Sequence, residues 1–171
     1  MTIAYGVLRY LRHTLHYDLK YTQSAKDLRI FGYSDSDHAS DLDYKSISGY
    51  VFKLNENSGL ISWRSCKQNL LATSSCEAEY IALHEAANEA LFLRQLFSEL
   101  TKSSMQQVNI FGDNQGAISL AKHAHYHRKT KHIAIKFHAL RDYVANKSIK
   151  LLYIPSAQNI ADMFTKALPN A

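Results

Sequence analysis

Four carboxylates lie where the sequence is expected to pass from one structural element to the next. Asp35 and Asp113 close two strand-like runs, and Asp162 lies in the first turn of a predicted last helix. The fourth, Glu79, lies near the start of a long predicted helix. Mg²⁺ prefers carboxylates, water and phosphate oxygens as ligands. Two such ions about 3.5–4 Å apart can activate a water and stabilise the leaving oxygen of a phosphodiester, and this is the chemistry that the four residues predict.

The first acid belongs to a crowded stretch, FGYSDSDHASD, at residues 31–41. Asp35 and Asp37 are two residues apart, so in a strand both would point to the same face. Like charges placed side by side repel, and one of the two carboxyls should resist ionisation. A divalent cation between the aspartates would explain why the sequence accepts this crowding.

Two glutamates near the start of the long helix are expected to have different roles. Ser74 and Glu77 have the spacing of a capping box, in which the glutamate returns to the backbone amide of the serine. Glu79 instead falls in a stripe of small and apolar residues, including Ala86 and Ala90, when the helix is projected at 100° per residue. A carboxylate in such a stripe is costly unless it is paired or bound to a metal. We therefore assign Glu79, and not Glu77, to the site.

Each acid also has an ordinary structural role open to it. Asp35 suits a turn and Asp113 suits a helix cap. Asp162 could complement a helix dipole, and Glu79 could be a solvated helix residue. The combined order Asp, Glu, Asp, Asp on this succession of elements is more specific than any single member.

Hydrophobic spacing predicts the elements that position these acids. We expect a helix over residues 3–16, a polar linker over 21–27, strands over 28–34, 47–54 and 60–66, a hairpin turn at 55–59, a helix over 75–100, a strand over 108–113, helices over 115–122 and 131–146, a strand over 149–154 and a helix over 159–167. Three antiparallel strands followed by alternating helices and strands predict an α/β protein. Its mixed five-stranded sheet should be parallel in the second half and flanked by helices.

The overall composition is that of a globular protein with a mild attraction to polyanions. The chain has 171 residues, 46% of them hydrophobic, and a net charge of +5, which allows one domain with a sizeable core. Cys66 and Cys76 match no zinc-binding spacing and are expected to be free thiols in a reducing compartment. No apolar run has the length of a membrane span, and no signal peptide is visible.

Five stretches of the sequence together carry a family resemblance. They are GYSDSDHASDLDYKSISGYVFKL, ISWRSCKQNLLATSSCEAEYIALHEAANEALFLRQLF, IFGDNQGAISLAKH, HRKTKHIAIKFHALRD and IPSAQNIADMFTKAL. In this order they resemble the ribonuclease H domain of copia-type LTR-retrotransposon Pol polyproteins over about residues 28–168. The resemblance implies a ribonuclease H-like fold, with the domain over residues 28–171. It also implies that residues 1–27 are a helix and linker joining the reverse transcriptase to this domain.

The resemblance also implies an activity and its partners. Asp35, Glu79, Asp113 and Asp162 match the four acids with which the family binds two Mg²⁺ or Mn²⁺ ions. Such enzymes cut the RNA strand of an RNA–DNA hybrid during reverse transcription. The implied partners are the hybrid and the reverse-transcriptase domain of the same polyprotein, and the implied location is a virus-like particle in the cytoplasm, or the nucleus.

Recognition of a hybrid should depend on its shape, phosphates and 2′-hydroxyls more than on base sequence. Expected contacts are Asp37 beside the metal site, Asn114 and Gln115 in the minor groove, Thr73, Ser74 and Ser75 at a helix N-terminus that suits a phosphate, and a basic patch of Arg128, Lys129, Lys131 and His132. Helix capping and a solvated loop are the ordinary alternatives for the last two groups. Trp63, on a predicted strand, is assigned to the core rather than to base stacking.

Two departures from the family pattern keep other functions open. The loop at residues 155–159 lacks the histidine that many ribonucleases H place before the last acid, and Ala134 stands where copia-type sequences commonly have aspartate. A binding remnant without turnover is therefore one alternative, and a purely architectural module is another. A transposase, integrase or junction resolvase of similar fold is a third; integrases, however, place their glutamate last, and a resolvase should prefer branched DNA.

The first predicted helix would expose apolar side chains once it is separated from its parent polyprotein. Val7, Leu8 and Leu11 lie on one side of it. We expect the helix to pack back on the domain or on a second copy of the chain, which would make it a homo-oligomer.

Overall fold

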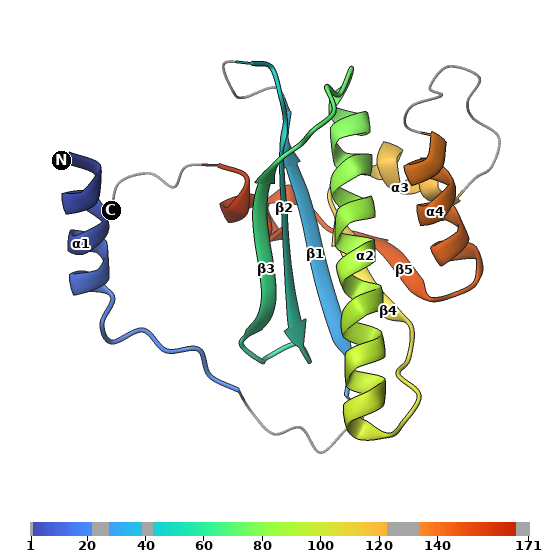
Figure 1. The fold of residues 1–171 in the computed structure, drawn as a ribbon, viewed down its shortest axis with the longest axis horizontal. Coiled ribbons are helices and arrows are strands. Elements are labelled where there is room, and N and C mark those ends of the chain that lie inside the picture. The colour runs from blue at the N-terminus through green and yellow to red at the C-terminus, as the bar shows by residue number, and fades with distance from the viewer. Residues whose placement is uncertain (1, 22–27, 39–42, 123–133, 167–171) are drawn as a thin grey trace.

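The computed structural model describes residues 2–21, 28–38, 43–122 and 134–166, and it contains the predicted five-stranded mixed sheet (Figure 1). The strands are β1 (Ile30–Asp37), β2 (Ile47–Leu54), β3 (Leu60–Lys67), β4 (Val108–Gly112) and β5 (Ile149–Tyr153). They lie in the order β3-β2-β1-β4-β5. The pairs β1–β2 and β2–β3 are antiparallel, whereas β1–β4 and β4–β5 are parallel, as the alternation of helices and strands predicts.

One long helix, α2 (Ser75–Thr101), supplies most of the cover on one face of the sheet. Its residues Ala86 and Ala90 are fully buried and pack in one core with Phe52 of β2 and Ile110 of β4. Small side chains on the helix and large ones on the strands interdigitate to fill this space. The helix ends where Lys102 adopts a left-handed conformation, with φ of 51°, which is a common way to terminate a helix.

The remaining helices in the body of the molecule pack beside α2. The helices α3 (Gln115–Lys122) and α4 (Ala134–Ala145) both contact α2 and contact each other. The bounds of α3 agree with the prediction, and residues 131–133 of the predicted fourth helix lie outside the described part of the chain. Among the described residues, no helix combines the length and apolar character needed to cross a membrane.

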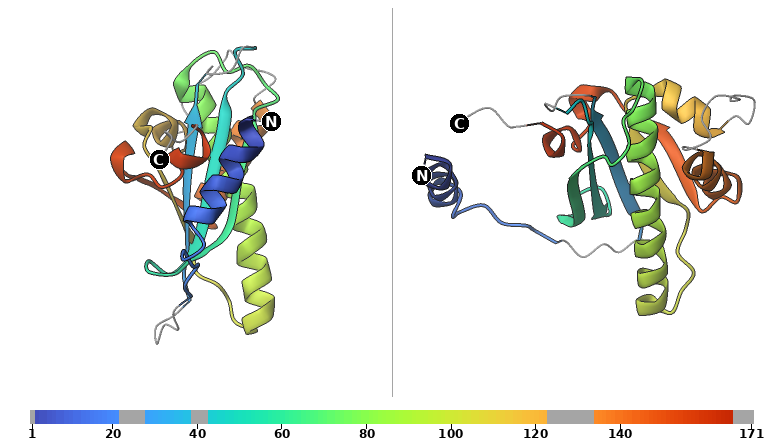
Figure 2. Two further views of the ribbon diagram at one scale, coloured as in Figure 1. Left: turned by 90° about the vertical axis from the view of Figure 1, so that its left-hand side faces the viewer. Right: turned by 45° about the horizontal axis from the view of Figure 1, so that its top comes forward.

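The N-terminal helix α1 (Thr2–His13) does not pack back on the domain, so that expectation is wrong (Figures 1 and 2). Val7, Leu8 and Leu11 are 54%, 61% and 52% exposed. Packing on a second copy gains no support from this single chain. The segment that follows α1 is nevertheless fixed to the sheet, because Tyr21 Oη donates to Leu60 O at 2.6 Å and the Gly59 amide donates to Lys20 O at 2.8 Å.

The predicted terminal helix over residues 159–167 is also wrong. In its place is one short 3₁₀ turn, η2 (Asp162–Phe164), which a second turn, η1 (Ser156–Gln158), precedes. Asn159 explains the difference, because its buried side chain donates from Nδ2 to Ser34 O at 3.0 Å and accepts at Oδ1 from the Ala161 amide at 3.2 Å. The first bond attaches the chain to β1, the second is local, and Asn159 has an extended conformation.

Two smaller expectations also need correction. Strand β1 continues to Asp37, three residues beyond its predicted end, so Asp35 and Asp37 lie within the paired strand, opposite Gly49 and Ile47 of β2. Trp63, assigned to the core, is 54% exposed on β3. It lies on the edge strand of the sheet, where a single neighbouring strand gives less cover.

Candidate metal centre

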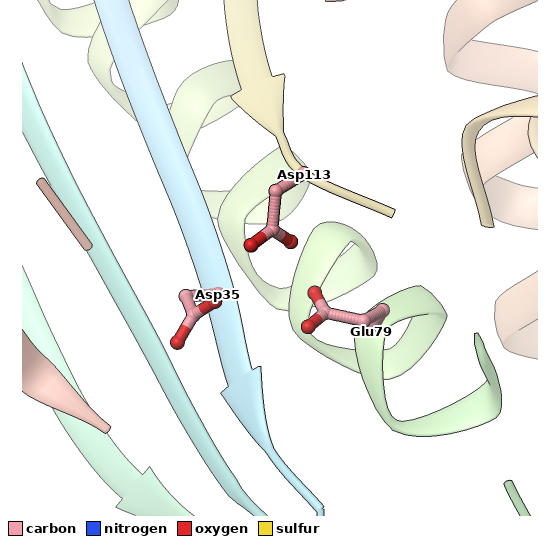
Figure 3. A group of neighbouring side chains, drawn as sticks. All are labelled: Asp35, Glu79 and Asp113. Carbon is pink, nitrogen blue, oxygen red and sulfur yellow. The ribbon is translucent and has the colours of Figure 1, made fainter. Parts of the chain in front are cut away.

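Three of the four predicted acids meet at one edge of the sheet. Asp35 comes from β1, Asp113 follows the last residue of β4, and Glu79 comes from the start of α2. Their carboxylates point toward one another, and each offers an oxygen within 4.8 Å of the others (Figure 3). The arrangement gathers residues that are far apart in the sequence.

The fold brings these side chains together through strand register and through a hydrogen bond between β1 and α2. Strands β1 and β4 are parallel neighbours in which Tyr33 pairs with Phe111, so Asp35 and Asp113 each lie two residues beyond that pair. The acids therefore share the carboxyl edge of the sheet, where sites in α/β folds commonly form. The Ser36 amide donates to Glu79 Oε1 at 3.2 Å and links α2 to β1 at the same point.

Electrostatics at this edge strongly favours a cation. Glu79 is 7% exposed and Asp35 is 3% exposed. Burial, together with the charges of Asp35 and Asp113, raises the pKa of Glu79 to about 8, although the Ser36 amide opposes the shift. Burial also raises the pKa of Asp35, with smaller contributions from Asp113 and Asp162 and an opposing hydrogen bond from Thr165. A hard divalent ion suits three converging carboxylates and would remove their mutual repulsion.

The fourth predicted acid lies beside this group and not within it. Asp162, in η2, makes an ion pair with Lys166, and both side chains are about half exposed. The charge of Asp162 nevertheless acts on Asp35, and the charges of Asp35 and Asp37 act on Lys166. Asp37 and Asp162 therefore both lie near Lys166, next to the three-acid group.

The start of α2 uses most of its polar groups to cap the helix. Ser74 Oγ accepts from the Glu77 amide at 3.2 Å, as the capping box predicts. The return bond differs, because Glu77 Oε2 accepts from the amide and the hydroxyl of Thr73, at 2.7 and 2.6 Å, and not from the amide of Ser74. Thr73, Ser74 and Ser75 are all exposed, and phosphate binding by them stays a prediction.

Removing this cap should have a measurable cost in stability. We expect Ser74→Ala to lower the free energy of unfolding by about 1 kcal/mol, because the Glu77 amide loses its partner at the helix end. Urea unfolding followed by circular dichroism measures the change. Ser75→Ala, one residue later and exposed, is the matched control and should unfold within about 0.5 kcal/mol of the wild type. Equal costs for the two variants would contradict the prediction.

The predicted minor-groove residues also lie at the edge of the candidate site. Asn114 Oδ1 accepts from the Ala117 amide at 3.0 Å, so this side chain caps α3. Gln115 is exposed and lines an open pocket of about 380 Å³ with Ile118, Ser119, Lys122 and Tyr153. The predicted basic patch of Arg128, Lys129, Lys131 and His132 lies outside the described residues.

Sequence reasoning did not identify Thr165 and Lys166, which contact two of the acids. Thr165 donates from Oγ1 to Asp35 Oδ2 at 2.5 Å, and Lys166 binds Asp162. The sequence contained a signal for both residues. Thr165 and Lys166 follow Asp162 by three and four positions, and residues with this spacing lie on the same side of a helical turn. The connection of Thr165 to Asp35, 130 residues earlier, has no sequence signal of its own.

Comparisons with known proteins place this geometry in context. No model of a known protein family matches the chain. The chain is 41% identical over 164 residues to the retrovirus-related Pol polyprotein from transposon TNT 1-94 of Nicotiana tabacum, covering 95% of this chain and 12% of that protein. It is 33% identical over 163 residues to the Pol polyprotein from transposon RE1 of Arabidopsis thaliana, covering 95% of this chain and 11% of that protein. The chain thus spans only a small part of the length of these relatives.

Solved structures give the same fold. The crystal structure of LC11-RNase H1 in complex with an RNA/DNA hybrid matches with a TM-score of 0.58 and 19% identity, over 80% of this chain and 93% of that one. The sheet order with parallel β1, β4 and β5 is therefore that of a ribonuclease H-like fold. The predicted fold class is confirmed.

Proposed function

We propose that this chain, which is homologous to part of the retrotransposon Pol polyproteins and has a ribonuclease H-like fold, is a metal-dependent endonuclease for RNA–DNA hybrids. It hydrolyses the RNA strand of the hybrid during reverse transcription. The observation that carries the proposal is the convergence of Asp35, Glu79 and Asp113, two of them buried, at one edge of the sheet. Its natural partner is the reverse-transcriptase domain of the same polyprotein, and its setting is the virus-like particle.

The proposed division of labour follows from where each acid lies. Asp35, Glu79 and Asp113 hold divalent cations, Mg²⁺ or Mn²⁺, through carboxylate oxygens that already face one another. Two such ions held there would supply activation of a water and stabilisation of the leaving oxygen of the phosphodiester. Asp162, about half exposed and paired with Lys166 beside the three-acid group, is the fourth acid of the proposed set. Asp37, whose charge acts on Lys166, is proposed as a further contact to the substrate.

Three further groups of residues are proposed to contact the hybrid. Gln115 is exposed directly after Asp113 and Asn114, so its amide suits sugar or base edges in the minor groove. Thr73, Ser74 and Ser75 at the exposed start of α2 suit a phosphate. Arg128, Lys129, Lys131 and His132 add positive charge for the backbone of the hybrid.

A second candidate function has one observation in its favour. Asp162 is not part of the three-acid group, and Lys166 occupies its carboxylate. A domain that bound hybrids through its surface but never assembled all four acids would be a weak or inactive remnant of the enzyme. This alternative predicts hybrid binding without metal-dependent turnover.

Cleavage of an end-labelled RNA–DNA hybrid separates the two functions. We expect cutting of the RNA strand with Mg²⁺ and none with EDTA, because the buried carboxylates need the cation. Single-stranded RNA, duplex RNA and duplex DNA are the matched substrates and should remain intact. An intact hybrid, at protein concentrations where binding is visible, would favour the remnant. Cutting that does not distinguish the hybrid from duplex RNA would overturn the proposed substrate.

A further inference from the structure

The residues that follow Asp162 pack against Asp35, one of the three acids. Thr165 is only 2% exposed, and its Oγ1 donates to Asp35 Oδ2 at 2.5 Å. This is the short distance of a hydrogen bond to a charged carboxylate. The last described segment of the chain therefore touches the first acid of the site.

Gly49 makes this close approach possible. It pairs with Asp35 across β1 and β2, so it lies next to that acid in the sheet. A Cβ atom on Gly49 would lie 2.8 Å from Thr165 Cγ2 and 2.9 Å from Phe164 Cβ. These distances are too short for two carbon atoms, so the neighbouring side chains would have to move. The methyl group of Thr165 thus packs on a strand position that has no side chain, and its hydroxyl reaches Asp35.

The hydroxyl proton of Thr165 has two acceptors within reach. Oγ1 lies 2.5 Å from Asp35 Oδ2 and 3.0 Å from Asp162 O. The Asp162 carbonyl already accepts from the backbone amide of Thr165 at 3.2 Å, whereas the carboxylate offers the stronger, charge-assisted bond. The hydroxyl is therefore available to Asp35.

A carboxylate that is held in one orientation binds a metal ion more tightly than one that rotates freely. An aspartate side chain can rotate about two bonds, and a hydrogen bond to one oxygen restricts both rotations. Groups that hold ligands in this way typically change metal affinity by about 10–100-fold when they are removed. Among the described residues, Thr165 is the only one whose side chain donates a hydrogen bond to Asp35.

We propose that Thr165 is a positioning residue of the metal centre. Its hydroxyl holds the Asp35 carboxylate in the orientation in which Asp35, Glu79 and Asp113 can share a divalent cation. This inference rests on the proposed metal-dependent function of the site. It gives the segment that follows Asp162 a role of its own in the metal centre.

Two substitutions separate the hydroxyl from the methyl group. Thr165→Val keeps the size and the methyl group that packs over Gly49 but removes the proton donor. Thr165→Ser keeps the donor and removes the methyl group. We expect Thr165→Val to weaken Mn²⁺ binding, measured by isothermal titration calorimetry, at least about tenfold. Thr165→Ser should retain Mn²⁺ affinity within about threefold, even where urea unfolding shows lower stability.

A matched control uses a threonine far from the site. Thr101 Oγ1 donates to Phe97 O at 2.7 Å at the exposed end of α2, so Thr101→Val also removes one threonine hydroxyl bond. It should bind Mn²⁺ like the wild type. In hybrid cleavage, Thr165→Val should raise the Mg²⁺ concentration that gives half-maximal rate and lower kcat, with KM for the hybrid unchanged.

The outcomes are distinguishable. Wild-type Mn²⁺ affinity in Thr165→Val, or an equal loss in Thr165→Ser, would overturn the positioning role and leave the proposed function standing. A wild-type protein that binds no Mn²⁺ would overturn both. If Thr165→Val does not fold, Gly49→Ala provides the same test, because the added Cβ displaces Thr165 while its hydroxyl remains. Weaker Mn²⁺ binding in Gly49→Ala supports the role, and unchanged binding overturns it.

Discussion

Asp113→Asn should abolish hybrid cleavage while leaving the fold intact. The substitution removes one of three converging carboxylates and keeps nearly the same size and shape. A metal ion supplies several kcal/mol of transition-state stabilisation, and each 1.36 kcal/mol is a factor of ten in rate. We therefore expect a loss of about 10³-fold or more in kcat for RNA cleavage with Mg²⁺. Gel-based cleavage of an end-labelled hybrid measures it.

The control for this experiment is an aspartate that the site does not use. Asp142 is exposed on α4, and Asp142→Asn should cleave the hybrid within about twofold of the wild type, as surface substitutions usually do. Circular dichroism and urea unfolding confirm that both variants are folded. Cleavage by Asp113→Asn at a rate near that of Asp142→Asn would remove Asp113 from the proposed mechanism.

The metal-free protein should lose stability as pH rises from about 5 to about 8. The pKa of Glu79 is raised from 4.5 to about 8 by burial and by the charges of Asp35 and Asp113. Below the lower value both the folded and the unfolded chain hold the proton, whereas between the two values only the folded chain does. The free energy of unfolding therefore falls with pH across this window, by an amount on the order of several kcal/mol. The raised pKa of Asp35 acts in the same direction.

Urea unfolding in EDTA across this pH range measures the effect. Glu79→Gln cannot ionise, so this variant should show a much flatter pH dependence and should exceed the wild type in stability near pH 8. Glu99→Gln, exposed near the end of the same helix, should keep the wild-type slope. Saturating Mg²⁺ should also flatten the wild-type curve, because the cation stabilises the ionised carboxylates. A wild-type slope retained in Glu79→Gln would contradict the assignment of the effect to Glu79.

The three-acid group was predictable because each member left a local signal. Asp35 and Asp113 lie at the carboxyl ends of hydrophobic runs that become parallel neighbours, β1 and β4. Glu79 interrupts a stripe of small residues that must face the sheet, and its neighbour Glu77 has the spacing of a cap. Periodicity of this kind depends on the backbone alone, so it can be recognised in a single sequence.

The end of the chain was mispredicted because long-range contacts decide its structure. Residues 159–167 have helix-forming composition, yet Asn159 bonds to Ser34 on β1 and the backbone forms short turns. Tertiary contacts commonly override propensity in this way. The hydrogen bond from Thr165 to Asp35 is of the same kind, since it depends on Gly49 leaving space between two strands. The predicted packing of α1 on the domain was wrong because its apolar side has no partner in the described chain.

The bonds of Lys20 and Tyr21 to the β2–β3 hairpin have a mechanical consequence. They attach the chain to the β2–β3 hairpin before the first strand begins, so a pull on the N-terminus would act first on the hairpin. A change in the orientation of α1 relative to the sheet would then involve the few residues between His13 and Lys20. The acids lie toward the other end of β1, away from these two bonds, so a change in the orientation of α1 would not act on them directly.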